Sequence, residues 1–242
     1  VGWQNTYLTM VGLMAIGLAT ILWSPEPEMP PAVPSTLKQA VWNPIAEFMG
    51  RPAALGFVGL MVLYKLGDAL AAVLTTPFLI NGVGFTLDDV GFIKGLGLGA
   101  TLLGAMIGAA VMARLGLFRS LMAFGALQAV SNLAFMALAW SGKSYILLVV
   151  AVAFENLSGG MGTTAFVVLV MSLCDHRYTA TQFAALTSLE ALNRVLLGGP
   201  AARLVGAVGW GTFFLLTFLA AIPGLWVLWR LRRHLPGLNR AG

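Results

Sequence analysis

Five ionisable residues lie near the middle of long apolar segments, where a charged side chain is costly: Lys65, Asp68, Glu155, Glu190 and Arg194. A charge at the centre of a bilayer costs at least ~2.5–3.5 kcal/mol, so such residues are rarely idle. Lys65 and Asp68 are spaced i, i+3, and Glu190 and Arg194 are spaced i, i+4, so each pair can neutralise itself on one helix face. Glu155 has no basic residue within reach on its own helix.

Glu155 distinguishes a functional from a structural role for these five residues. Its carboxyl group must be protonated, solvated or paired with a residue of another helix. The five residues are three acids, on three helices, and two bases, so one acid is left without a basic partner. This imbalance favours a central aqueous cavity that handles a polar solute and a proton. We expect Glu155 to carry the coupled proton, with Asp68 and Glu190 as further candidates. In the structural alternative, the two pairs fasten helices together and Glu155 binds Lys65 or Arg194.

The composition indicates that these residues belong to an integral membrane protein. Of 242 residues, 59% are hydrophobic and 10% are charged, against about 45–50% and about 25% in soluble domains. The formal net charge is +5, and the basic residues occupy short gaps between apolar runs. Such residues determine membrane topology, so we do not expect nucleic acid as a partner. Cys174 is the only cysteine, which excludes a disulfide framework.

Seven apolar segments are long enough to cross the ~30 Å hydrocarbon layer as helices of about 20 residues. We expect spans at residues 7–23, 53–80, 90–113, 119–141, 144–173, 181–203 and 207–230. The connections between the last six are short, so neighbouring helices should run antiparallel. The pairs Gly95/Gly99 and Gly104/Gly108 have the spacing that lets membrane helices approach closely.

The segment between the first two spans predicts a linker. Its first part, residues 24–35, is rich in proline, and apolar residues then recur at helical spacing, which predicts a helix on the membrane surface. Counts of Lys and Arg place the linker and the C-terminus in the cytoplasm, with Lys94, Lys143 and Arg203 on the opposite side. The expected domains are residues 1–23, the last transmembrane helix of a missing N-terminal half; 24–52, a cytoplasmic linker; 53–230, a six-helix bundle; and 231–242, a basic cytoplasmic tail.

Several runs of residues carry a resemblance to a known family. They are Tyr64 to Asp68 (YKLGD), Phe118 to Leu121 (FRSL), Gln128 to Asn132 (QAVSN), Glu155 to Phe166 (ENLSGGMGTTAF) and Gly209 to Phe214 (GWGTFF). These runs resemble the AmpG muropeptide permeases, a branch of the major facilitator superfamily, in which each half is a six-helix unit. We therefore expect an all-α polytopic membrane protein, the six-helix C-terminal half of a major facilitator transporter plus one preceding transmembrane helix.

The resemblance implies proton-driven import of anhydromuropeptides, which are peptidoglycan recycling fragments, from periplasm to cytoplasm across the bacterial inner membrane. Such solutes carry carboxylates, hydroxyls and amides. Lys65 and Arg194 suit the carboxylates, and the guanidinium can bind one through a bidentate fork. Further contacts to sugar or peptide are expected from Asn156, Asn193, Gln128 and Tyr64. The expected partners are this solute, protons, the lipid bilayer and the missing N-terminal half, without a cofactor.

Other functions stay open on the sequence alone. One alternative is a major facilitator carrier for another bulky anionic solute, such as an acyl-coenzyme A. A heptahelical receptor or retinal protein needs a ligand-anchoring residue in its last span, and that span carries no charge before Arg230. A membrane enzyme needs a nucleophile or metal site, but Cys174 and His176 share a short loop and such neighbours rarely face each other. We therefore predict no catalytic activity and no metal ion.

Overall fold

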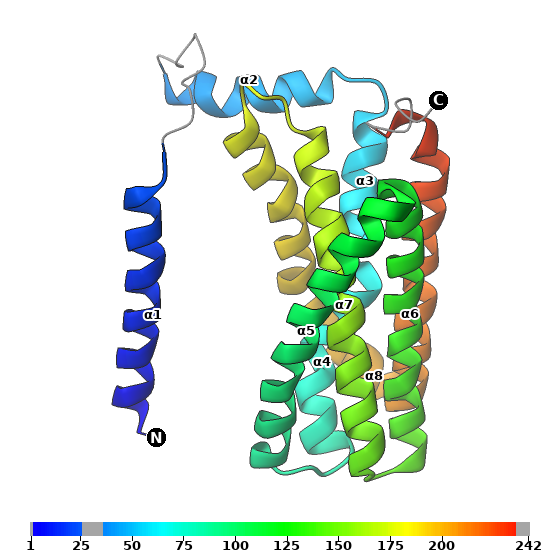
Figure 1. The fold of residues 1–242 in the computed structure, drawn as a ribbon. Coiled ribbons are helices and arrows are strands. Elements are labelled where there is room, and N and C mark those ends of the chain that lie inside the picture. Colours follow the sequence, from blue (N-terminus) through cyan, green and yellow to red (C-terminus); the bar gives the residue numbers. More distant parts are fainter. Residues whose placement is uncertain (1, 26–35, 236–242) are drawn as a thin grey trace. The chain divides into compact units, whose positions relative to one another are not determined.

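The computed structural model describes residues 2–25 and 36–235, and every regular element within them is helical. The chain separates into two compact units, Val1–Ser35 and Thr36–Gly242. Parts of the predicted linker and basic tail, residues 26–35 and 236–242, lie outside the described residues. Helices long and apolar enough to cross a membrane dominate both units (Figure 1). The predicted all-α, polytopic fold is confirmed.

Helix α1, Trp3–Trp23, is the only described helix of the first unit. Its 21 residues include no charged side chain, and none of them is buried. At 1.5 Å per residue the helix is about 31 Å long, which matches the hydrocarbon thickness of a bilayer. By length and composition α1 is a membrane span.

The second unit holds the remaining helices, and Figure 1 shows its long helices packed side by side with α2 across one end. They are α2 (Leu37–Met49), α3 (Ala54–Tyr64), α4 (Leu66–Pro77), the π-helical turn η1 (Phe78–Gly82), α5 (Leu87–Leu115), α6 (Leu117–Ser141), α7 (Tyr145–Leu173), α8 (Thr179–Leu231) and the short 3-10 helix η2 (Arg232–His234).

Helix α8 contains two membrane spans that meet at Gly209. A straight helix of its 53 residues would be about 80 Å long, far more than a bilayer accommodates. Gly209 has φ 77° and ψ 167°, a backbone conformation that glycine adopts without steric cost, and the chain turns back there (Figure 1). The predicted connection at residues 204–206 is therefore wrong, because the helix continues through it to Val208. Counting both segments of α8, the described residues contain seven spans, as the sequence predicts.

The first span of the bundle, predicted as one helix over residues 53–80, is interrupted at Lys65. Helix α3 ends at Tyr64 and α4 begins at Leu66, with Lys65 at φ −99° and ψ 4° between them. The second half of α8 packs closely against this interruption. A Cβ atom on Gly224 would lie 2.7 Å from the Cα atom of Tyr64, so only glycine permits this approach.

Helices α5 and α7 also meet through glycines. A Cβ atom on Gly108 would lie 2.8 Å from the Cα atom of Met161, and one on Gly104 would clash with the carbonyl oxygen of Leu157. The predicted packing role of Gly104 and Gly108 is confirmed. Gly95 and Gly99 differ, because no atom of the described residues lies within 4 Å of a Cβ atom built on either.

A polar network fastens α2 to the ends of α7 and α8. The Arg51 guanidinium donates to both carboxylate oxygens of Glu47, at 2.8 and 2.7 Å, and to the carbonyl oxygen of Leu173. Gln182 on α8 donates to Glu47 at 2.7 Å and accepts from the amide of Asp175 at 2.7 Å. The hydrogen bonds from Arg51 hold the pKa of Glu47 below its usual value. Helix α2 is therefore anchored by partly buried polar contacts as well as by its apolar side chains.

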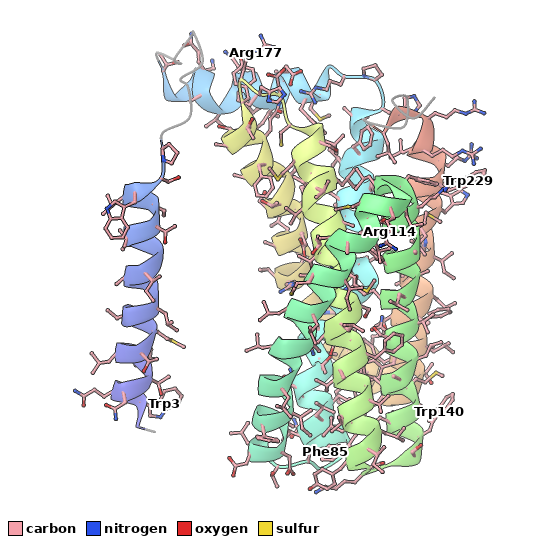
Figure 2. All side chains as sticks on the ribbon, viewed as in Figure 1. Trp3, Phe85, Arg114, Trp140, Arg177 and Trp229 are labelled. Atoms are coloured by element: carbon pink, nitrogen blue, oxygen red, sulfur yellow. The ribbon has the colours of Figure 1, made fainter. Side chains whose placement is uncertain are left out.

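Two apolar clusters pack the bundle, one toward each end. Along α7, Leu148 and Val152 belong to one cluster, whereas Phe166 and Leu169 belong to the other. Figure 2 shows Arg177 near the end where α2 lies and Phe85 at the opposite end. Polar residues of α7, from Glu155 to Thr164, lie between the two clusters. The bundle thus has an apolar cluster toward each end and a polar region at its middle.

Replacing Gly104 by alanine tests the packing of α5 on α7. The new methyl group meets a backbone carbonyl that cannot move aside, so Gly104→Ala should destabilise the protein by about 1–3 kcal/mol. Thermal unfolding of the full-length protein in detergent measures the loss. The matched control is Gly59→Ala on α3, where no atom lies within 4 Å of the new carbon and alanine is the better helix former. Equal stability of the two variants would contradict the packing role.

Candidate functional site

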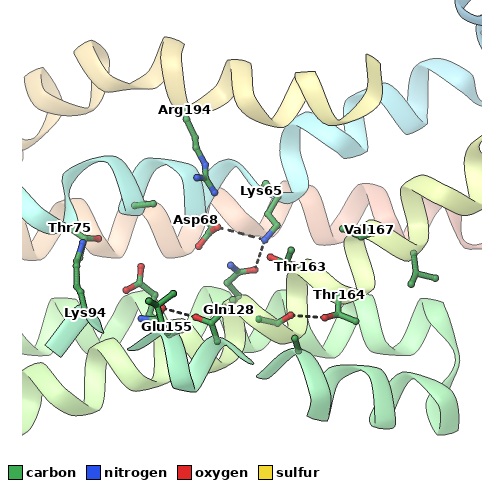
Figure 3. A pocket seen from close by; sticks show the side chains of 18 residues that line it. Lys65, Asp68, Thr75, Lys94, Gln128, Glu155, Thr163, Thr164, Val167 and Arg194 are labelled. Atoms are coloured by element: carbon green, nitrogen blue, oxygen red, sulfur yellow. Dashed lines mark hydrogen bonds and ion pairs between the residues drawn. The ribbon is translucent and has the colours of Figure 1, made fainter. Parts of the chain in front are cut away.

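A cavity of about 680 Å³ lies at the polar middle of the bundle (Figure 3). Its walls come from the α3–α4 interruption and from α4, α5, α6, α7 and α8. Its charged and amide side chains are Lys65, Asp68, Lys94, Gln128, Glu155, Asn156 and Arg194, and its hydroxyls are those of Thr75, Thr101, Thr163 and Thr164. This volume falls within the usual range of small-molecule sites.

Lys65 occupies the interruption and is 2% exposed. Its Nζ atom lies 3.8 Å from the Oδ2 atom of Asp68 and donates to the Oε1 atom of Gln128 at 3.4 Å. Asp68 lies in the first turn of α4, where the positive end of the helix dipole favours a carboxylate. The predicted pairing of Lys65 with Asp68 is confirmed, although the two residues do not share an uninterrupted helix. Gly162 leaves room for Gln128, because a Cβ atom there would lie 2.7 Å from the amide oxygen.

The second predicted pair is also present, on the first half of α8. The Nη2 atom of Arg194 lies 3.7 Å from the Oε1 atom of Glu190. Arg194 lines the cavity, whereas Glu190 does not. Figure 3 shows the guanidinium close to Asp68 and Lys65. Two of the cations that line the cavity, Lys65 and Arg194, thus each lie beside an acid.

Glu155 lies in the cavity wall without a partner for its carboxylate. In the part of the chain that the structure describes, no hydrogen bond or ion pair involves its side-chain oxygens. The structural alternative, in which Glu155 binds Lys65 or Arg194, does not describe this arrangement, because both cations contact other acids. Figure 3 shows Glu155 between Lys94 and Asp68.

Lys94 does not lie on the far side with the loop cations, as the count of basic residues assumed. It falls within the predicted span 90–113 and within α5, and it lines the cavity, where its Nζ atom donates to the Oγ1 atom of Thr76 at 2.6 Å. Helix α5 begins at Leu87, before the predicted span, and Thr86 and Asp89 form a capping box there with reciprocal hydrogen bonds of 3.1 Å. The sequence argument that acids outnumber bases is therefore wrong, because three bases line the cavity, not two. The position of Lys94 inside an expected span was the signal that could have included it among the buried charges.

Asn156 lines the cavity, but neighbouring groups occupy its amide. Its Oδ1 atom accepts from the hydroxyl of Thr101 at 2.9 Å, and its Nδ2 atom donates to the carbonyl oxygen of Val152 at 2.8 Å. Thr101, Thr163 and Thr164 contribute hydroxyls to the wall that the sequence analysis missed, because an isolated threonine in an apolar segment carries no distinctive signal.

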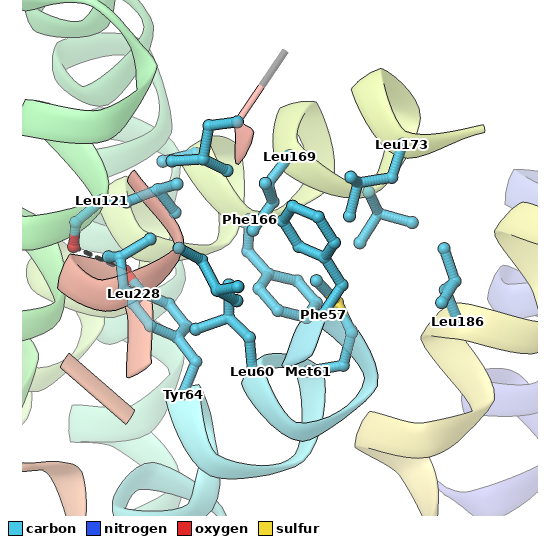
Figure 4. Packing of buried hydrophobic residues seen from close by; sticks show 14 of the residues in the cluster. Phe57, Leu60, Met61, Tyr64, Leu121, Phe166, Leu169, Leu173, Leu186 and Leu228 are labelled. Atoms are coloured by element: carbon cyan, nitrogen blue, oxygen red, sulfur yellow. Dashed lines mark hydrogen bonds between the residues drawn. The ribbon is translucent and has the colours of Figure 1, made fainter. Parts of the chain in front are cut away.

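Tyr64 and Asn193 do not line this cavity. Tyr64 is packed in an apolar cluster (Figure 4), where its ring stacks on Phe166 and its hydroxyl donates to the carbonyl oxygen of Leu121 at 2.9 Å. Asn193 donates to the carbonyl oxygen of Val62 at 2.8 Å. That carbonyl belongs to the last turn of α3, where helix carbonyls lack intrahelical partners. Asn193 thus supports the helix interruption.

Comparisons with known proteins agree with this architecture. The family model described as Major Facilitator Superfamily matches residues 1–198. The chain belongs to the major facilitator superfamily. Polar residues gather at the middle of the present bundle, and solute sites of this superfamily lie near the middle of the membrane.

The chain is also similar to several curated proteins. It is 49% identical over 228 residues to the anhydromuropeptide permease of Escherichia coli K12, an alignment that covers 94% of this chain and 46% of that protein. It is 32% identical over 232 residues to putative transporter AmpG 4 of Rickettsia conorii, covering 93% and 56% of the two chains. The predicted resemblance to the AmpG permeases is confirmed. The chain spans about half the length of the curated relatives it matches.

Asn193→Ala tests whether Asn193 stabilises the interruption of this major facilitator bundle. Removing the donor should cost about 1–2 kcal/mol, the range found for hydrogen bonds between membrane helices in model peptides. Thermal unfolding should show this loss, while the folded fraction keeps its solute affinity. Val195→Ala is the control, because Val195 is 78% exposed on the same helix. Normal stability with weakened solute binding would instead return Asn193 to the solute contacts.

Proposed function

We propose that this chain forms part of a proton-driven transporter that imports anhydromuropeptides from the periplasm to the cytoplasm and releases them chemically unchanged. The observation that carries the proposal is the 49% identity, over 94% of the chain, to a permease named for that solute. The cavity supports it, because Lys65 and Arg194 present cations to the carboxylates of such a solute. The same relative is named for an anhydromuropeptide and not for an acyl-coenzyme A, which disfavours the alternative solute.

The orientation belongs to the same proposal. Residues 1–23 would be the last helix of an N-terminal half, 24–52 a cytoplasmic linker, and 231–242 a cytoplasmic tail in the bacterial inner membrane. The basic residues at the α2 end of the bundle support this assignment. With Lys94 inside the cavity, the opposite end keeps only Lys143 and Arg203 of the three cations assigned to it, so the charge asymmetry is larger than the sequence indicated.

Uptake of labelled anhydromuropeptide tests the transported solute directly. Vesicles that carry the full-length transporter should accumulate it when the outside is more acidic than the inside, and only weakly without this gradient. A labelled acyl-coenzyme A serves as the competing solute. Gradient-driven accumulation of the latter alone, or of neither, would contradict the proposed solute.

Arg194→Lys tests the contact with a solute carboxylate. Lysine keeps the charge but loses the planar fork that binds both carboxylate oxygens. We expect the apparent KM for uptake to rise about tenfold, which corresponds to roughly 1.4 kcal/mol, with normal expression. Arg203→Lys is the matched control, because Arg203 does not line the cavity. Unchanged uptake by Arg194→Lys would leave Arg194 only its ion pair with Glu190.

Glu155→Gln tests the proton carrier. Glu155 is the cavity acid without a partner among the described residues, so its carboxyl group is free to load a proton from outside and release it inside. Glutamine mimics the protonated state, so this variant should lose accumulation driven by the pH gradient and keep counterflow exchange. Asp88→Asn, in the exposed first turn of α5, is the control. Full gradient-driven accumulation by Glu155→Gln would pass the role to Asp68, to Glu190 or to the N-terminal half of the transporter.

A further inference from the structure

Lys94 is a cation of the cavity that forms no ion pair among the described residues. In the part of the chain that the structure describes, ion pairs involve Lys65 and Arg194 but not Lys94. The Nζ atom of Lys94 donates instead to the neutral hydroxyl of Thr76, at 2.6 Å. An ammonium group that donates one hydrogen bond has two further N–H donors. Lys94 is therefore ready to receive an anionic group.

Glu155 is the cavity acid that, like Lys94, lacks an ion pair among the described residues. Lys65 and Arg194 are already engaged with other acids, and Figure 3 shows Glu155 between Lys94 and Asp68. The cavity-lining charged and amide groups that face Glu155 from the other elements are Lys94 on α5, Lys65 and Asp68 at the α3–α4 interruption, Gln128 on α6 and Arg194 on α8.

On the basis of the proposed function, we infer that Lys94 forms a second anion-binding subsite, which takes a carboxylate of the solute when Glu155 is protonated. The first subsite consists of Lys65 and Arg194. Figure 3 shows Glu155 between Lys94 and the Lys65–Asp68 pair. The cavity is thus suited to a solute that carries at least two carboxylates at separate positions, as the peptide part of an anhydromuropeptide can.

The two carboxylates compete for one ammonium group. A protonated Glu155 has no charge with which to attract Lys94, so the ammonium group is available to the solute. An ionised Glu155 attracts Lys94 strongly, because the low-dielectric interior screens charges weakly. Proton binding and solute binding therefore favour each other, as linkage requires of any two coupled sites. Thr76 holds the ammonium group in place without neutralising it.

Binding of two matched probes to the full-length transporter tests the subsite. One probe is an anhydromuropeptide with a free tripeptide, and the other is the same compound with its peptide carboxyls amidated. Lys94→Gln should weaken binding of the free-carboxylate probe by about 10- to 100-fold, the usual effect of losing a charged hydrogen bond. It should change the affinity for the amidated probe far less. Lys94→Arg should restore binding.

The pH dependence provides a readout that loss of packing would not change. In the wild type, affinity for the free-carboxylate probe should fall as the pH rises and Glu155 loses its proton. Glu155→Gln should keep the low-pH affinity across the range, because glutamine never competes for Lys94. Lys94→Gln should remove most of the dependence. Lys143→Gln is the control, since Lys143 is exposed and donates to the carbonyl oxygen of Gly84 outside the cavity.

The outcomes separate the two proposals. Equal losses for both probes in Lys94→Gln, or an unchanged pH dependence in that variant, would overturn the subsite. Failure of the wild type to bind either probe would overturn the proposed function instead. Size-exclusion chromatography checks folding, and Lys94→Met, which keeps the apolar stem of the side chain, replaces Lys94→Gln if the latter does not fold.

Discussion

Lys65 is 2% exposed and lies between the two apolar clusters of the bundle, and much of the surrounding structure serves to hold its ammonium group. A buried charge is tolerated when an opposite charge and hydrogen bonds replace its water. Asp68 and Gln128 supply these contacts. The acid stands at the start of a helix because the membrane span is interrupted immediately before it. The interruption and the charge thus depend on each other.

Glycines and one asparagine make this interruption possible. Gly224 brings the last segment of α8 against the end of α3, and Asn193 satisfies a carbonyl in the last turn of α3. Gly162 leaves the space that Gln128 occupies. Without water, a membrane protein must satisfy each freed backbone group internally. Residues that the sequence analysis assigned to solute or to generic packing therefore position the cavity's charges.

The cavity charges fall into two groups with different consequences. Lys65 and Arg194 stand beside acids, and such pairs hold a fixed charge at low cost. Glu155 and Lys94 line the same cavity without ion pairs among the described residues. In the transport that we propose, Glu155 takes the proton and Lys94 binds the anionic solute. The paired set follows from the spacing of each acid and base along one segment of chain, whereas Glu155 and Lys94 come from different helices, α7 and α5.

By itself the sequence determined the membrane class, the number of spans and both short-range ion pairs, because hydropathy and helical spacing act over a few residues. Motif resemblance indicated the superfamily. Only the tertiary structure decided where Lys94, Tyr64 and Asn193 lie. Lys94 lies within a span that hydropathy predicts, but only the packing of α5 against its neighbours decides that it lines the cavity. Tyr64 and Asn193 donate hydrogen bonds to backbone carbonyl oxygens of other helices. Such contacts between residues distant in the chain produce no periodic pattern in a single sequence.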